Sequence, residues 1–400
     1  MNQRTSYESQ RQGLEDEIQK QFGELQKHRP NILVVGRTGA GKSSLINTVL
    51  GEKLAVTGAG RPITQSYEIF QHPLVTMIDS KGWEGGGEGE QRFREDTARL
   101  LKDRRTTNPD DHIHIVWYAV SAPDARFEDF EAQLIREAFG GIPVLFVLTK
   151  CDIIAEDALV NVEQAIKTAA TTMARQATKN APAPRIVGII RTSADPLPLL
   201  RQAPWGMDVV VEMTRDELPA LYRNAFDAAQ SVDFSLKARK AQAVVIGAAA
   251  TAATIGLIPI PFSDSVLLTP LQVSMVTTIA IIYGFGADPG SLTALIGGSV
   301  APLASESVGV TLAGNLLKFF PGAGSVLGGV IEGTVASTIT AAIGYGFQRA
   351  FHQLALRQAT GKENMSIEGV GQFLKQALPA LMEEIRKRGV KNVLPDGSDA

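Results

Sequence analysis

The stretch that decides the fold is "GRTGAGKS", residues 36–43. It matches the pattern G-x-x-x-x-G-K-[ST], directly after the apolar run "ILVV" and directly before the helical run "SSLINTVL". In this context the glycines let backbone N–H groups turn towards phosphates, and the helix N-terminus adds its dipole. We expect Lys42 to reach the β- and γ-phosphates and Ser43 to bind Mg²⁺. The predicted phosphate-binding residues are Gly36, Arg37, Thr38, Gly39, Ala40, Gly41, Lys42, Ser43 and Ser44.

Around this loop, short apolar runs alternate with longer polar helical patterns from residue 31 to about residue 194. The runs are "NILVVG", "LVTMIDS", "IHIVWYAVSA", "PVLFVLTK" and "RIVGIIRTSA". This rhythm is typical of a mainly parallel sheet covered by helices on both faces. We therefore predict an α/β fold of the P-loop type over residues 30–222, after an N-terminal helix at 1–29.

Base recognition is assigned to "TKCD", residues 149–152, at the end of the run "PVLFVLT". It matches the guanine motif [NT]-K-x-D. The Asp152 carboxylate can accept hydrogen bonds from guanine N1–H and the N2 amine, whereas adenine leaves it unpaired, which is costly. "SA" at 193–194 fits the short motif whose backbone contacts guanine O6. The predicted ligands are GTP and GDP, and the predicted base-binding residues are Thr149, Lys150, Asp152, Ser193 and Ala194.

With these motifs in this order, the sequence resembles an Era-like GTPase of the TRAFAC class over roughly residues 30–222. The resemblance implies that "DSKGW", residues 79–83, is the DxxG segment, in which Asp79 binds Mg²⁺ through a water and Gly82 offers its N–H to the γ-phosphate. It also implies a switch threonine near Mg²⁺ and the γ-phosphate. We assign this role to Thr64, with Thr57 as the alternative. The expected metal residues are then Ser43, Thr64 and Asp79, and those expected to act in catalysis are Lys42, Thr64 and Gly82.

Trp83 stands where Ras-like GTPases carry a glutamine that orients the attacking water. An indole cannot do this, and many Era-like GTPases carry a hydrophobic residue there. Either Trp83 packs against the sheet or covers the site, or it retracts while another group positions the water. The candidates for that group are Gln65, Glu88, Glu90 and Gln91. We expect turnover on the order of 10⁻² s⁻¹ or less without a partner.

The composition changes in the second half of the chain. No Lys or Arg occurs between Lys240 and Lys318. The stretches 244–262 and 265–287 contain no charged residue. A helix that is apolar all round is buried in protein or in lipid. The length permits a bilayer span, whereas the Ala and Gly content and the Pro and Gly interruptions argue against one. A packed bundle and a membrane-inserted domain both stay open.

This half resembles a bacterial helical domain of unknown function that is fused to Era-like GTPases, over roughly 225–350. The matching residues are "PIPFSD" (259–264), Gln272, Met275, "IYG" (282–284) and "LLKFFPGAG" (316–324). The resemblance implies an all-α domain with membrane association. The order of N-terminal helix, G domain and helical domain is also similar to immunity-related, dynamin-like GTPases. We predict an Ala/Gly-rich helical domain at 223–352 and an amphipathic helix with a polar tail at 353–400.

These features predict a bacterial GTP-binding and GTP-hydrolysing switch whose nucleotide state acts on the helical domain. The expected partners are GTP, a second copy bound through the G domain, and a membrane surface or bilayer bound through 241–350. The net charge of −3 lacks a basic surplus, so we expect no nucleic acid. One cysteine and an N-terminus without a signal-peptide core predict the cytoplasm, with or without membrane association. The alternatives are a nucleotide-stabilised scaffold for oligomerisation and an integral membrane effector gated by its G domain.

Overall fold

The computed structural model describes residues 2–51, 61–62, 66–83, 87–124, 127–178, 182–196, 203–255, 270–304, 333–363 and 365–393. The chain forms two compact units. Leu25–Asp233 make up the first, which we call the α/β unit. Met1–Glu24 and Phe234–Ala400 make up the second, the helical unit.

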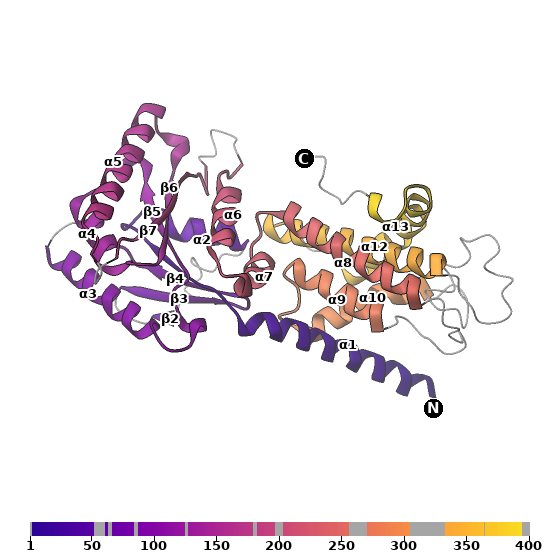
Figure 1. Cartoon of the computed structure of the whole chain (residues 1–400). Coiled ribbons are helices and arrows are strands. Elements are labelled where there is room, and N and C mark those ends of the chain that lie inside the picture. Colours follow the sequence, from indigo (N-terminus) through magenta and orange to yellow (C-terminus); the bar gives the residue numbers. More distant parts are fainter. Residues whose placement is uncertain are drawn as a thin grey trace. The chain divides into compact units, whose positions relative to one another are not determined.

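The α/β unit is built on a seven-stranded sheet with the order β2-β3-β4-β1-β5-β6-β7 (Figure 1). The strands are β1 (Asn31–Val35), β2 (Arg61–Pro62), β3 (Tyr67–His72), β4 (Val75–Ser80), β5 (Ile115–Ser121), β6 (Pro143–Thr149) and β7 (Arg185–Arg191). From β4 to β7 every neighbouring pair is parallel, while β2 and β3 form an antiparallel edge. The predicted mainly parallel sheet is confirmed, and its central strands are continuous apolar runs because both of their faces are buried.

Helices cover both faces of this sheet, with α3, α4 and α5 on one side and α2, α6 and α7 on the other (Figure 1). Their bounds are α2 (Lys42–Leu50), α3 (Gly87–Arg104), α4 (Asp129–Ala138), α5 (Glu156–Arg175), α6 (Met207–Glu217) and α7 (Ala220–Ala229). Successive side chains of β5 point to opposite faces of the sheet. Tyr118 packs in the cluster that holds Leu134 of α4 and Ile166 of α5. Trp117 points the other way, and its indole N–H donates to Thr214 Oγ1 of α6 at 2.9 Å.

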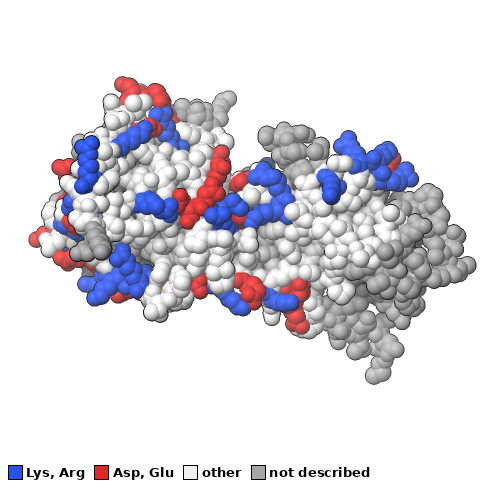
Figure 2. All heavy atoms as spheres, viewed as in Figure 1, with Lys and Arg blue, Asp and Glu red and all other residues white. Residues whose placement is uncertain are grey.

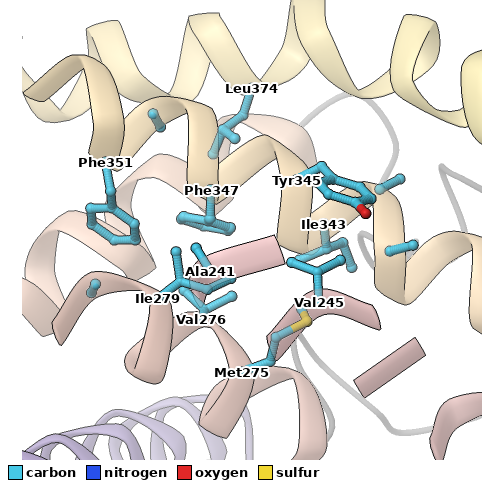
Figure 3. Packing of buried hydrophobic residues seen from close by; sticks show 14 of the residues in the cluster. Ala241, Val245, Met275, Val276, Ile279, Ile343, Tyr345, Phe347, Phe351 and Leu374 are labelled. Carbon is cyan, nitrogen blue, oxygen red and sulfur yellow. The ribbon is translucent and has the colours of Figure 1, made fainter. Parts of the chain in front are cut away.

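The helical unit packs α8 (Phe234–Ile255), α9 (Pro270–Ile282), α10 (Pro289–Ala304), α12 (Gly333–Ala359) and α13 (Ile367–Arg388) around one apolar core. Side chains from α8, α9, α12 and α13 point towards one another there (Figure 3). A Cβ on Gly344 of α12 would lie 2.7 Å from a methyl group of Val245 and 2.9 Å from the sulfur of Met275. A side chain at this position would therefore displace Val245 and Met275, so glycine favours the close approach of α8, α9 and α12.

The helix α1 (Asn2–Lys27) contributes its first part to the same core. Ile18 of α1 is fully buried in the cluster, and Gln21 donates to Ser274 Oγ at 3.0 Å and accepts from Thr278 Oγ1 at 2.8 Å. The chain thus begins in the helical unit, forms the α/β unit, and returns to the helical unit at Phe234.

In the parts of the chain that the structure describes, none of the helices combines the length and the apolar character needed to span a bilayer. The segments "PIPFSD" and "LLKFFPGAG", and the rest of residues 256–269 between α8 and α9, lie outside the described residues.

Candidate nucleotide-binding site

The motifs singled out in the sequence meet at one edge of the sheet, because the carboxyl ends of its parallel strands lie together there. Gly36 follows β1, Asp79 lies at the end of β4, Thr149 ends β6 and Ser193 follows β7. This is the edge at which open α/β sheets bind ligands.

The phosphate loop joins β1 to α2 and takes its shape from glycines. Gly39 and Gly41 have φ values of 78° and 80°, in the left-handed region that other residues rarely adopt. Gly36 packs on β5 so closely that a Cβ there would collide with the carbonyl oxygen of Ala119. The loop backbone therefore curves tightly around the N-terminus of α2, as a phosphate cradle requires.

Lys42, the first residue of α2, folds back over this loop. Its Nζ donates to the carbonyl oxygens of Gly36 at 3.0 Å and Arg37 at 2.9 Å. Burial lowers the pKa of Lys42, and the nearby Asp79 carboxylate raises it. The ammonium group is therefore held at the mouth of the loop.

Ser43 and Asp79 lie side by side next to the loop. Ser43 Oγ donates to Asp79 Oδ2 at 3.4 Å, and Asp79 is only 8% exposed. Burial raises the pKa of Asp79 to about 6, although Lys42 and the Ser43 hydrogen bond oppose the shift. Among the described residues, Asp79 Oδ1 has no hydrogen-bond partner. A buried, unpaired carboxylate oxygen beside a hydroxyl fits the oxygen ligands that Mg²⁺ prefers.

Gly82 brings the DxxG segment directly onto the phosphate loop. Its φ is 84°, and a Cβ there would collide with the backbone nitrogen of Thr38. One residue further on, the Trp83 carbonyl accepts a hydrogen bond from Thr38 N at 3.4 Å. Only glycine fits at position 82, both for its conformation and for the space.

The Trp83 indole packs in the core of the α/β unit. The side chain is 3% exposed, and its ring centroid lies 4.8 Å from that of Phe93, 5.7 Å from Phe130 and 6.2 Å from Tyr118. Of the two sequence-based alternatives, this structure has the indole packed inside. Thr57, Thr64 and Gln65 lie outside the described residues.

The other candidates for positioning water lie in the first turns of α3. Glu88 and Gln91 are exposed, and Gln91 donates to Glu95 of the same helix at 3.0 Å. Glu90 is half-buried. Among the described residues, none of the three forms a hydrogen bond or an ion pair with the phosphate loop.

The base-recognition residues are tied to the phosphate loop. Thr149 Oγ1 donates to Ala40 O at 2.8 Å, and Lys150 Nζ donates to Gly39 O at 2.7 Å. Lys150 has a φ of 56°, the one positive value on a residue other than glycine among those described. Its left-handed backbone turns the chain so that its stem lies along the loop.

Ser193 does more than the sequence indicated. The motif predicted a backbone contact to the base, whereas in the structure the Ser193 hydroxyl donates to Asp152 Oδ1 at 2.7 Å. Ala194 O accepts from Thr48 Oγ1 of α2 at 3.2 Å. A pair of backbone hydrogen bonds joins Ser193 to Trp205. These contacts orient the carboxylate that we assign to guanine.

Sequence reasoning missed the surroundings of the Arg37 side chain. Its guanidinium forms an ion pair with Glu128 at 2.5 Å, and its Nε lies 4.0 Å from Glu131. Burial raises the pKa of Glu131, which accepts a hydrogen bond from the Tyr118 hydroxyl at 3.2 Å. The signal in the sequence is the spacing of Glu128 and Glu131, which form a capping box at the start of α4.

Two family models match the chain. Residues 31–150 match the model described as 50S ribosome-binding GTPase, and residues 225–378 match a domain of unknown function, DUF697. The probable GTP-binding protein EngB of Aquifex aeolicus is 30% identical over 129 residues, which are 31% of this chain and 67% of that protein. The chain belongs to this family of GTPases.

Further relatives of this GTPase include EngB of Ligilactobacillus salivarius, 31% identical over 31% of this chain and 62% of that protein. GTPase Era of Lactobacillus delbrueckii is 27% identical over 33% of this chain and 42% of that protein. The chain thus spans about two thirds or less of these curated relatives. Toc33 from Arabidopsis thaliana, solved with Mg²⁺ and GMPPNP, shares 18% identity with a TM-score of 0.33, over 50% of this chain and 91% of that one. That structural similarity is too low to add to the assignment.

Proposed function

We propose that this GTPase binds GTP with Mg²⁺, hydrolyses it slowly to GDP and phosphate, and passes its nucleotide state to the helical unit. The observation that carries the proposal is the meeting of three groups at one sheet edge. These are the Lys42 ammonium at the mouth of the loop, the Ser43–Asp79 pair with its unpaired oxygen, and the Asp152 carboxylate oriented by Ser193.

Each group has a role that follows from its chemistry. Lys42 exchanges its two carbonyl partners for the β- and γ-phosphates, and Gly82 offers its N–H to the γ-phosphate. Ser43 and Asp79 would hold Mg²⁺, Asp79 through a water, and Thr64 would complete that set. The metal ion would neutralise charge on the phosphate oxygens. Asp152 accepts the guanine N–H groups while Thr149 and Lys150 fix its strand end to the loop.

Slow turnover follows from Trp83. A buried indole cannot orient water, so the group that does so comes from elsewhere in the chain, from a second copy or from another partner. A homodimer through the α/β unit would make turnover per molecule rise with protein concentration. A membrane partner of the helical unit would make it respond to liposomes.

The test is phosphate release from GTP, measured over a wide range of protein concentration, with and without liposomes. Lys42→Ala serves as the control for contaminating activity. We expect slow turnover at low concentration, an increase on self-association, and no turnover in the variant. Many turnovers per second in the dilute protein would contradict the proposed mechanism, and equal activity in Lys42→Ala would contradict the site.

Within the α/β unit, contacts join the segment after Thr64 to α3, and under the proposed coupling they would pass a change in that segment to this helix. Ser66 Oγ donates to Asp96 at 2.7 Å, and the hydroxyls of Tyr67 and Thr97 are 2.6 Å apart. These bonds connect the start of β3 to the helix that follows the DxxG segment. We expect hydrogen exchange to differ between the GDP-bound and GTP-analogue-bound protein in residues 207–350. Identical protection in the two states would contradict the coupling.

A further inference from the structure

A cavity of about 640 Å³ lies at the opposite edge of the sheet from the nucleotide site. Its wall includes Pro143, the first residue of β6, whereas Thr149 of the guanine motif is the last residue of that strand. At about 3.3 Å per residue the two ends are roughly 20 Å apart. The cavity is therefore separate from the nucleotide site, and its volume is within the range of small-molecule sites.

The lining of the cavity carries an excess of positive charge. It includes Arg104 at the end of α3, Arg105 just after it, Arg136 near the end of α4, and the acid Glu137. Glu137 is already paired with Arg94 at 3.3 Å, outside the lining. With Asp111, which lies near Arg104, there are four arginines against two carboxylates. On the face shown in Figure 2, acidic and basic side chains both occur over the α/β unit.

Two of these arginines have no side-chain hydrogen bond or ion pair with any described residue. Arg136 donates to Gln176 at 2.7 Å, whereas Arg104 and Arg105 have no such partner. Arg104 is half-buried, and this burial lowers its pKa while Asp111 raises it. A desolvated guanidinium without a hydrogen-bond acceptor is costly, and a bound anion would satisfy it.

The rest of the wall combines apolar and polar groups. Leu101, Ile113 and Ile142 line the cavity beside Thr106 and His112, and Leu101 and Ile113 belong to the core cluster of the α/β unit. A small ion alone would leave most of a cavity of about 640 Å³ filled with water. A ligand with an apolar or aromatic body would fill it, and a doubly negative head group would balance the excess of two positive charges.

We propose that this cavity binds a phosphomonoester with an aromatic or apolar body, whose phosphate is held by Arg104 and Arg105. The planar guanidinium groups can pair with phosphate oxygens in the bidentate manner that lysine cannot achieve. The competing explanation is that these arginines only interact with the partial negative charge at the C-terminus of α3. In that case they need no ligand, and no phosphomonoester will bind.

The test uses the full 400-residue chain with its nucleotide site saturated by GMPPNP and Mg²⁺, so that the β- and γ-phosphate positions are both occupied and closed to the probe. Phenyl phosphate is titrated by calorimetry, with inorganic phosphate and phenol as half-ligands. We expect one phenyl phosphate per chain and weaker binding of both half-ligands. Arg104→Gln and Arg105→Gln are each expected to weaken phenyl phosphate by roughly tenfold or more, since each removes a charge-assisted hydrogen bond.

Arg99→Gln is the matched control, because Arg99 is exposed on α3 outside the lining. Thermal unfolding verifies that each variant is folded, and Arg105 is exposed, so its variant keeps the core intact. Absence of phenyl phosphate binding, or an equal loss in Arg99→Gln, overturns the proposal. Equal affinity for phenyl phosphate and inorganic phosphate overturns the role of the apolar wall. GMPPNP binding is measured separately, so failure of the nucleotide site is distinguishable.

Discussion

Replacing Trp83 tests whether its indole is a core residue or a retractable cover for the nucleotide site. The ring packs against Phe93 and Phe130 at centroid distances of 4.8 and 5.7 Å. Its N–H has no hydrogen-bond partner among the described residues. Trp83→Phe therefore keeps an aromatic ring and loses no hydrogen bond, Trp83→Ala leaves a cavity, and Trp83→Gln places an amide in the core.

The expected losses of unfolding free energy follow from this packing. Deleting a buried Trp side chain to Ala costs about 3–5 kcal/mol. Trp83→Gln is expected to cost about as much. The amide fills part of the cavity, but burying it without a hydrogen-bond partner costs about 1–3 kcal/mol. Trp83→Phe is expected to cost about 1–2 kcal/mol for the smaller ring. In a unit of this size each kcal/mol lowers the melting temperature by about 2–4 °C.

Tryptophan fluorescence measures the unfolding of the α/β unit, which contains Trp83. All three tryptophans, at positions 83, 117 and 205, lie in the α/β unit, so the signal excludes the helical unit. Trp117 is fully buried and remains as the reporter in every variant. Urea unfolding without nucleotide gives the stability, because bound ligand would add its own contribution. Phosphate release from GTP gives the turnover of the same samples.

We expect the order of stability to be wild type, Phe, then Gln and Ala, with no gain in turnover for Trp83→Gln. A variant Trp83→Gln that unfolds within about 1 kcal/mol of wild type and hydrolyses GTP at least tenfold faster would refute the reasoning. The indole would then be a cover, and the position would accept the glutamine of Ras-like enzymes.

Three further predictions concern the nucleotide site. Lys42→Ala should weaken GTP binding by roughly tenfold to a hundredfold, because it removes a charged hydrogen bond to phosphate, and equilibrium titration with a fluorescent GTP analogue measures this. Asp152→Asn should reduce the preference for GTP over ATP by roughly a hundredfold. Ser193→Ala should reduce this preference less, because it removes only the 2.7 Å hydrogen bond that orients Asp152. Competition binding of GTP and ATP measures both effects. Asp79, with a pKa of about 6 in the fold, holds its proton more tightly than in the unfolded chain. The nucleotide-free protein should therefore lose up to about 3 kcal/mol of stability as pH rises from about 4 to 6, and urea unfolding of Asp79→Asn should lack this loss.

The parallel sheet was predictable because its central strands are apolar on both faces and most of them follow a helical pattern. Once the strands are parallel, the clustering of Gly36, Asp79, Thr149 and Ser193 at one edge follows from the topology alone. The antiparallel pairing of β2 with β3 leaves a weaker signal, since β2 is only two residues long. The ligands of these residues stay predictions, because ligand binding depends on groups that the fold alone does not supply.

Contacts between residues distant in sequence could not be predicted. The ion pair of Arg37 with Glu128 joins residues 91 positions apart in sequence, and the spacing of Glu128 and Glu131 indicates the start of a helix but not this partner. The burial of Trp83 depends on Phe93 and Phe130 arriving from α3 and α4. From sequence alone, a tryptophan after the DxxG glycine could equally cover the nucleotide site or pack in the core. Only the positions of Phe93 and Phe130 in the fold distinguish the two.

The division of the chain limits how a nucleotide signal can reach the helical unit. The α/β unit is inserted into the helical unit, because the chain leaves that unit after Glu24 and re-enters it at Phe234. The first connection is anchored by Ile18 in the core and by the hydrogen bonds of Gln21 to α9. The second begins α8, whose Val245 packs against Met275 and Ile343 (Figure 3). Both connections therefore enter the same core, and under the proposed coupling a displacement of the α/β unit would be transmitted through α1 and α8. A helical unit joined by one linker would lack this constraint.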